Sequence, residues 1–514
     1  MTLHIHIPAL SEKPAAYSLE KLLRSWYLIA LAPLAGAAAA YLIAAGMWPV
    51  ILAVLAAPVG FVILHRRPLI GLFAWLFLAQ FIMDADTTAM RMVYWAIHRA
   101  LPPLTIAIIV ISSWLGLSRR ELPKLGWPEI AMVGYLVATE FSIVYRNSNP
   151  TGTTVWLYDR VFVPMCLYFI VRLLAPGERD FRQLAVIALT ISVAQSLIGM
   201  VSWVAPQILP SMWDSVHVRD RTVGSLENPV IYTTALAFGS LLAMHAGMNA
   251  KSGLVRTAFI GAFLVGTYGI FISFTRASWL GGLIGIAGLT FLYPGFMLRL
   301  LLVAALIVGG VGGVLLADQI SQAAHRLDSD QSQESALSRL PIIYASIRMF
   351  QARPLFGWGY GNFDRYDREF QGRVADLVNP EKDHTSHNLY LTILAEQGLL
   401  GIVLYLGPVL WWLALSSVAL LRTKGKGFWN WKLLFVLWLI VAHAFIVNNF
   451  FNTIIPYALG IWWITLGLIG SFVSSSLAAK PDDARALPPY RIPGIASTSY
   501  KTPALAELTR RRNT

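Results

Sequence analysis

The segment Asp383–Gly401 reads DHTSHNLYLTILAEQGLLG, and it joins a polar, histidine-bearing stretch directly to an apolar run that continues to residue 421. Crossing a bilayer core takes roughly 20 mostly apolar residues. This run is therefore long enough to span a membrane, and Gly398 is its predicted break. Histidine titrates near neutral pH, so His387 at the mouth of a helical bundle is suited to exchange a proton or to hold an anion.

The composition extends this interpretation to the whole chain. Hydrophobic residues make up 56% and charged residues 13% of the sequence, and the mean hydropathy is +0.60. These values are typical of a polytopic membrane protein, and apolar segments of roughly 20 residues predict an all-α fold of about 12 to 14 transmembrane helices, with one large periplasmic loop that carries short helices. The predicted segments are 27–46, 49–65, 68–83, 101–117, 128–145, 160–174, 183–204, 229–247, 256–274, 277–293, 299–317, 388–421, 431–450 and 455–475.

The net charge of +13 is explained by short basic clusters between these segments. If the N-terminus is cytoplasmic, all of these clusters lie on the cytoplasmic side, as the positive-inside rule requires. Both termini are then cytoplasmic. The clusters are 65–67, 118–120, 172–182, 251–256 and 422–426. Topology and attraction to anionic lipid account for them better than nucleic-acid binding does. No cleavable signal peptide is recognised in residues 1–20, and the inner membrane of a bacterium is the expected location.

The predicted organisation has five parts: a cytoplasmic N-terminus (1–26), an N-terminal transmembrane bundle (27–317), a large periplasmic loop (318–387), C-terminal transmembrane helices (388–476) and a disordered cytoplasmic tail (477–514). The loop contains a predicted interfacial helix at 338–350, a tight glycine–aromatic loop at 354–363 and a polar stretch at 364–383. That last stretch is interpreted as a mobile lid or rim, with an ordinary solvated loop as the alternative.

The first candidate site is the start of the segment at 388. Ser386 is the predicted N-cap, and the helix N-terminus beside His387 and Asn388 favours an anion. A histidine tolerated at an interface is the alternative. Glu396 argues against that alternative, because a carboxylate inside an apolar span is costly and indicates function.

Two further candidates lie at predicted segment ends on the same side. Arg276 follows an almost absent loop, and its guanidinium can grip a phosphate in a bidentate way, although snorkelling to headgroups is the alternative. Arg219 and Arg221 precede Asn228 and Pro229, which suit a helix start. Two arginines and a histidine on one face suit a diphosphate. The chain lacks a phosphate-loop, zinc-helix, nucleophile-elbow or CxxC signature, and the single Cys166 lies within a predicted span.

These residues resemble those of the O-antigen ligase and O-antigen polymerase family of bacterial membrane glycosyltransferases. The resemblance rests on Asn228-Pro229, on 274–281 (FTRASWLG), on Arg339 followed by 354–359 (PLFGWG), and on 387–401 (HNLYLTILAEQGLLG), and it covers about 220 to 410. Thr275 stands where many members have serine, which keeps a hydroxyl.

The resemblance implies a metal-independent, cofactor-free, inverting transfer of a glycan from undecaprenyl diphosphate to an acceptor hydroxyl at the periplasmic face. His387 would orient or deprotonate that hydroxyl. Arg276 and Arg221 would bind the diphosphate. The supporting residues would be Arg219, Asn228, Arg339, Asn388 and Glu396. The acceptor would be a glycan, a lipid or a protein, and membrane lipids and other polysaccharide-assembly proteins are the further expected partners; no nucleic acid is expected.

Four interpretations remain open from the sequence. A ligase attaches a finished glycan to a different acceptor, whereas a polymerase of O-antigen or exopolysaccharide joins repeat units; protein O-glycosylation is a branch of the same class. A transporter or flippase of lipid-linked or anionic substrates would use the same arginines without breaking a bond. It would, however, need polar groups reachable from both sides near the midplane, which the sequence does not indicate.

Overall fold

The computed structural model confirms an all-α protein: every regular element among the described residues is helical. The described residues are 58–82, 87–118, 122–210, 213, 221–226, 228–307, 309–310, 317–328, 337–372, 387–423, 427–450 and 456–478. The longer helices are α4 (Leu69–Leu78), α5 (Thr88–Tyr94), α6 (Leu101–Trp114), α7 (Trp127–Arg146), α8 (Pro150–Leu157), α9 (Val163–Leu174), α10 (Glu178–Val204), α11 (Pro229–Met248), α12 (Gly253–Ile272), α13 (Arg276–Leu292), α14 (Pro294–Ile307), α16 (Ala317–Asp328), α18 (Leu340–Ala352), α19 (Phe363–Gln371), α21 (Leu389–Arg422), α22 (Trp431–Phe450) and α23 (Pro456–Ala478). Short 3₁₀ or π-helical pieces are η1 (Ala79–Phe81), η2 (Trp95–Ala100), η3 (Tyr158–Phe162) and η4 (Pro206–Ile208).

Seven helices in the described ranges are long and apolar enough to cross a membrane, or eight if the bent pair Pro58–Arg66 and Leu69–Phe81 forms one span. α13 and α14 are apolar but shorter. The chain is therefore a multi-pass membrane protein. The predicted segment 27–46, most of 49–65 and nearly all of the predicted tail lie outside the described residues.

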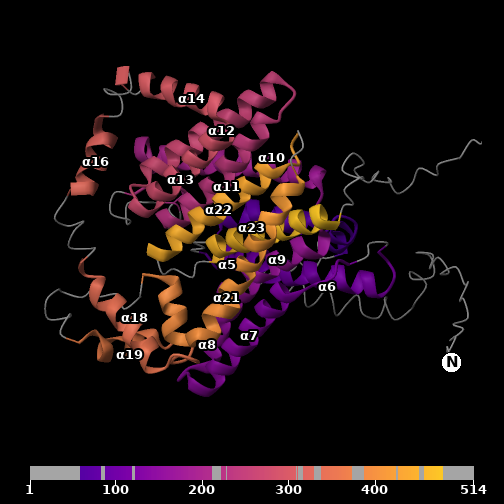
Figure 1. The fold of residues 1–514 in the computed structure, drawn as a ribbon, viewed down its shortest axis with the longest axis vertical. Coiled ribbons are helices and arrows are strands. Elements are labelled where there is room, and N and C mark those ends of the chain that lie inside the picture. Colours follow the sequence, from indigo (N-terminus) through magenta and orange to yellow (C-terminus); the bar gives the residue numbers. More distant parts are fainter. Residues whose placement is uncertain are drawn as a thin grey trace, which may run out of the picture.

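The centre of the bundle is built on α11 and α23 (Figure 1). The 18-residue apolar window of α11 is buried along its whole length, and that of α23 is 89% buried. A helix that is apolar all round finds its stable place inside a bundle. α11 packs against α10, α12 and α22, while α23 packs against α9, α21 and α22.

Two helices begin earlier than the hydropathy of the sequence predicts. The segment expected at 101–117 is the end of a continuous helix, Thr88–Trp114, and the segment expected at 160–174 continues a helix that starts at Pro150. Both contain a π-helical turn. Polar residues in these extensions lower the local hydropathy, but they pair with each other in the structure. Arg99 donates two hydrogen bonds to the Asp159 carboxylate, at 2.8 and 3.1 Å.

Arg172 is not the surface charge that its place in a basic cluster predicts. Its Nε donates to Glu129 Oε1 at 2.8 Å, and both side chains are buried. The Tyr168 hydroxyl donates to the same carboxylate oxygen at 2.8 Å, and Trp412 Nε1 donates to Tyr168 at 3.0 Å. A buried charge is tolerated when it is paired and hydrogen-bonded, and this network joins α7, α9 and α21.

The segment predicted as a large loop, 318–387, contains α18, α19 and nearly all of α16 in its described part. α18 confirms the helix predicted at 338–350. The first part of the predicted lid is helical instead: α19 buries Phe363 and Asp367 while Arg365 and Arg368 stay exposed. Its amphipathic pattern explains the helix. Residues 373–386 lie outside the described residues.

Candidate functional site

The start of α21 is held in a strained conformation at His387. Its φ is +47°, in the left-handed region that residues other than glycine rarely adopt. Asn388 is the N-cap, in place of the predicted Ser386, and its side-chain oxygen accepts hydrogen bonds from the backbone N–H groups of Tyr390 and Leu391, both at 3.0 Å. Asn388 therefore caps the free N–H groups of this helix, and the His387 side chain does not take part in the cap. His387 is partly exposed at this helix start.

The start of α13 shows the same kind of strain. Phe274 has a φ of +47°, and the turn between α12 and α13 is as short as predicted. Residues 273–275 of the turn are buried, whereas Arg276 is exposed as the first residue of α13. Trp279 Nε1 donates to the Phe271 carbonyl at 2.8 Å, which closes the turn. The turn therefore buries Ser273, Phe274 and Thr275 and leaves Arg276 exposed at the start of α13.

The start of α11 confirms the expected helix signals. Asn228 is the N-cap, and its side chain accepts a hydrogen bond from the N–H of Val230 at 2.8 Å. Pro229 occupies the first helical position. The preceding turn contains Gly224 with a φ of +61°, where a Cβ would lie 2.3 Å from Gln195 Oε1. Arg221 is in this turn; Arg219 lies outside the described residues.

Gln195, which the sequence did not single out, holds the turn that carries Arg221. Its side-chain amide donates to Ser225 Oγ at 2.7 Å and to Gln80 Oε1 at 2.8 Å, and its oxygen accepts from the Ser225 N–H at 3.1 Å. On the other side of the turn, Trp203 Nε1 donates to Thr222 Oγ1 at 2.5 Å. No local pattern could reveal these contacts, because each partner lies on a different helix or turn.

The starts of α11 and α13 are neighbours. The hydroxyls of Thr233 and Ser278 lie 2.6 Å apart, near the start of each helix. The Trp203 ring also contacts the Phe274 ring, with centroids 5.6 Å apart, while its indole N–H binds the Arg221 turn. The structure therefore brings the segments of Arg221, Asn228 and Arg276 together.

The starts of α13 and α21 both flank the same part of α22. Lys432 at the start of α22 donates to the carbonyl of Leu292 at the end of α13 at 2.8 Å, so the two helices run antiparallel. Gly281 in α13 packs on His443, and Tyr390 in α21 stacks on Phe445 with ring centroids 4.6 Å apart. Arg276 and His387 each precede these contacts, so both lie toward the end of α22.

Glu396 is fixed by backbone donors of the segment 354–363. Its carboxylate accepts from the Phe363 N–H at 2.9 Å, and its own carbonyl accepts from the Gly359 N–H at 2.6 Å. The Trp358 N–H donates to the Ala395 carbonyl at 3.0 Å. The buried carboxylate is thus hydrogen-bonded to the backbone of this segment.

Gly398 is the predicted break in α21, with a φ of +65° and a ψ of −157°. The break frees backbone donors, and the segment 354–363 uses them: Leu399 N–H donates to Pro354 at 2.7 Å and Leu400 N–H to Leu355 at 3.1 Å. We call this crossing of residues 354–363 over residues 395–400 the backbone clamp. It fixes the first half of α21, which begins two residues after His387.

α7 holds the other side of the backbone clamp. Arg146 donates to the carbonyl of Gly357, and Asn147 donates to the carbonyl of Tyr360 at 3.0 Å. Gln397 bonds to α7 through Thr139 and Tyr135, both at 2.9 Å. Burial raises the pKa of the Tyr360 phenol.

Arg339 is the residue before α18 and does not belong to the clamp itself. α18 packs on α21, and Ile342 and Met349 share a buried cluster with Ala395 and Phe363. The Trp358 indole donates to the Met349 carbonyl at 2.9 Å, and the Arg353 guanidinium lies 3.9 Å from the centre of the Trp358 ring. These contacts tie α18 to α21, the helix that follows His387.

The hydrogen bonds by which Gln195 holds the turn of Arg221 give a testable prediction. If Arg221 binds a lipid diphosphate, as the resemblance implies, Gln195→Ala should raise the KM for that donor about tenfold, because losing two buried hydrogen-bond partners costs on the order of 1–3 kcal/mol. Steady-state kinetics with purified protein measure this. Gln207→Ala, at an exposed position beyond the same helix, is the matched control and should leave KM unchanged. An equal effect of both variants would refute the role of Gln195.

The comparison with known families supports the resemblance seen in the sequence. A family model described as O-antigen ligase matches residues 261–406, a range that contains Arg276, Arg339, His387, Asn388 and Glu396 but neither Arg221 nor Asn228. None of the curated proteins matches this chain. Within this multi-pass membrane protein, residues 261–406 are therefore similar to the O-antigen ligase family.

Proposed function

We propose that the protein transfers a glycan from undecaprenyl diphosphate to an acceptor hydroxyl at the periplasmic face of the bacterial inner membrane, as an O-antigen ligase-like glycosyltransferase. The observation that carries the proposal is the pair of strained helix starts at Phe274 and His387. Left-handed non-glycine residues cost about 1–2 kcal/mol and cluster at functional sites. Here they project Arg276 and His387 beside the same end of α22.

The proposed reaction is an inverting displacement. The acceptor oxygen attacks the anomeric carbon of the donor sugar and its proton passes to the His387 imidazole. The bond between that carbon and the diphosphate oxygen breaks, and its electron pair leaves with the diphosphate. Arg276 and Arg221 stabilise the departing charge, for which preorganised cations are effective. Asn388 and Glu396 position the helix that carries His387.

The charge distribution supports a periplasmic site. Basic residues cluster at the opposite helix ends, namely at the turn between α11 and α12 and at the end of α21. The positive-inside rule assigns those ends to the cytoplasm. The starts of α11, α13 and α21 then face the periplasm, where a lipid-linked donor would present its glycan.

The experiment is polysaccharide profiling in a host that lacks this gene and is complemented with the wild-type protein. We expect lipid-linked glycan to accumulate in the deletion strain and to return to normal on complementation. Full-length chains on the carrier would identify a ligase, and single repeat units would identify a polymerase. Accumulation of glycan on the cytoplasmic side only would contradict the proposal and favour a flippase.

A further inference from the structure

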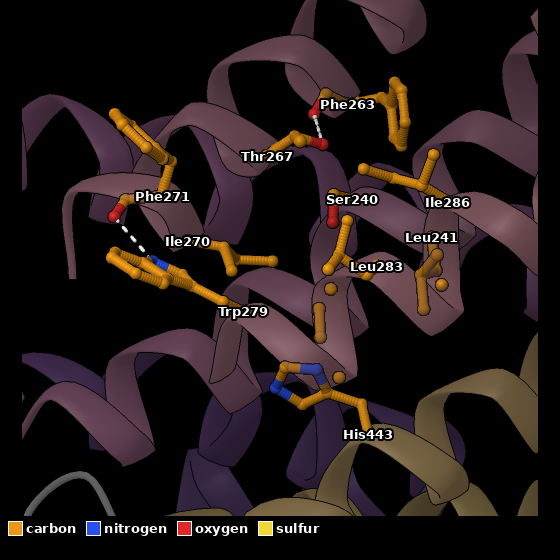
Figure 2. A pocket seen from close by; sticks show the side chains of 14 residues that line it. Ser240, Leu241, Phe263, Thr267, Ile270, Phe271, Trp279, Leu283, Ile286 and His443 are labelled. Atoms are coloured by element: carbon orange, nitrogen blue, oxygen red, sulfur yellow. Dashed lines mark hydrogen bonds between the residues drawn. The ribbon is translucent and has the colours of Figure 1, made fainter. Parts of the chain in front are cut away.

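An apolar cavity of about 450 Å³ opens between α11, α12, α13 and α22, close to the start of α13. Its walls include Phe263, Ile270, Phe271, Trp279, Leu283 and Ile286, and the His443 ring lies at its floor (Figure 2). Nearly all of the surface that lines it is apolar. A pocket of this size is in the range that holds small-molecule ligands.

The cavity reaches the outside of the bundle. Leu283 lines it and is nevertheless 64% exposed. α13 presents glycines rather than side chains to its neighbours here: a Cβ on Gly282 would lie 3.2 Å from Ile270, and one on Gly285 would lie 3.2 Å from Leu241. In a multi-pass membrane protein, an exposed apolar side of this kind faces lipid, so a hydrocarbon chain can enter sideways from the bilayer.

The cavity also begins about one helical turn from the proposed diphosphate-binding residue Arg276. Trp279 lies one turn after Arg276 on α13, and its ring stacks on Phe271 with centroids 6.0 Å apart. Leu283 and Ile286 follow along the same face of α13. A lipid whose diphosphate binds Arg276 would therefore run its chain past Trp279 and into this space.

We propose that the cavity binds the first isoprene units of the polyprenyl chain of the donor, an inference that rests on the proposed function. A dry cavity of about 150 Å³ can hold a benzene ring; the space here is about three times that volume. It takes the head-proximal units of a branched, unsaturated chain, and the remainder of the chain stays in the bilayer. The flat aromatic walls suit the planar double bonds of such a chain.

The test is a comparison of two donors that carry the same glycan diphosphate, one on a long polyprenyl chain and one on a short prenyl chain. The full-length protein is reconstituted in phosphatidylethanolamine–phosphatidylglycerol vesicles. Leu283→Trp fills the cavity and should raise the KM for the long-chain donor about tenfold, the loss of roughly two buried methylene groups. The KM for the short-chain donor should change much less. Ile284→Trp, at the adjacent exposed position outside the cavity, is the matched control and should change neither KM.

Binding of sugar-free long-chain polyprenyl diphosphate, followed by native mass spectrometry, gives a readout that does not need transfer activity. Wild type and Ile284→Trp should retain this lipid, whereas Leu283→Trp should lose it at an unchanged melting temperature. Retention by all three proteins, or a phospholipid in the cavity that the diphosphate fails to displace, would overturn the inference. Binding that follows the cavity variant while wild type transfers no glycan would instead overturn the proposed function and leave the cavity assignment standing.

Discussion

His387→Asn is expected to lower kcat for glycan transfer by about 100- to 10,000-fold, the range typical for loss of a general base. KM for the donor should change little, because the diphosphate is assigned to Arg276 and Arg221. Asparagine is the informative replacement, since it tolerates the left-handed backbone that His387 adopts with a φ of +47°. The variant removes the imidazole and keeps the helix start.

The measurement is single-turnover transfer with purified protein, after the melting temperatures of the variants have been matched. His65→Ala is the control, since that imidazole bonds Ser112 in a different part of the molecule, at 2.9 Å. A His387→Asn protein that keeps most of its kcat would remove histidine from the chemistry. The transporter reading would then gain support, because a carrier needs the arginines but no proton acceptor.

Elements that depend on local pattern could be predicted from the sequence. The last three spans agree with the structure to within a few residues, because long apolar runs bounded by capping residues need no knowledge of partners. The break at Gly398 and the helix start at Pro229 were equally local. The sequence missed the early start at Thr88 because Arg99 looks unsuited to a span until its partner, Asp159, is known.

In the candidate site, too, features set by a local motif could be predicted, whereas features set by a distant partner could not. The residue types of Arg276 and His387 and their places at helix starts could be predicted, because both follow from short motifs. What Glu396 does could not, since its partner Phe363 lies on a separate segment and is reached through a backbone N–H that no side-chain pattern marks. The same holds for Gln195, whose contacts join three separate parts of the chain.

The backbone clamp yields the second large expected effect. Gly357→Ala and Gly398→Ala should each destabilise the protein by about 2–5 kcal/mol, the sum of roughly 1–2 for a left-handed backbone and 1–3 for overpacking. A Cβ on Gly357 would lie 2.3 Å from the Glu396 carbonyl carbon, and one on Gly398 would lie 2.5 Å from that of Leu355. Both clashes are with backbone, which cannot rotate away as a side chain can.

Thermal unfolding of the purified variants in detergent measures this effect, and Gly407→Ala is the matched control. Gly407 lies in the same helix with open space around its Cβ position, so alanine there should be neutral or stabilise by about 0.5–1 kcal/mol. Because the backbone clamp fixes the half of α21 that directly follows His387, the clamp variants should also lose kcat below their melting temperatures. The double variant should lose less free energy of unfolding than the two single variants lose together. Both substitutions disturb the same crossing, and a shift that relieves one clash also relieves part of the other. Additive losses would mean that the two glycines act independently and that the clamp is not a single unit.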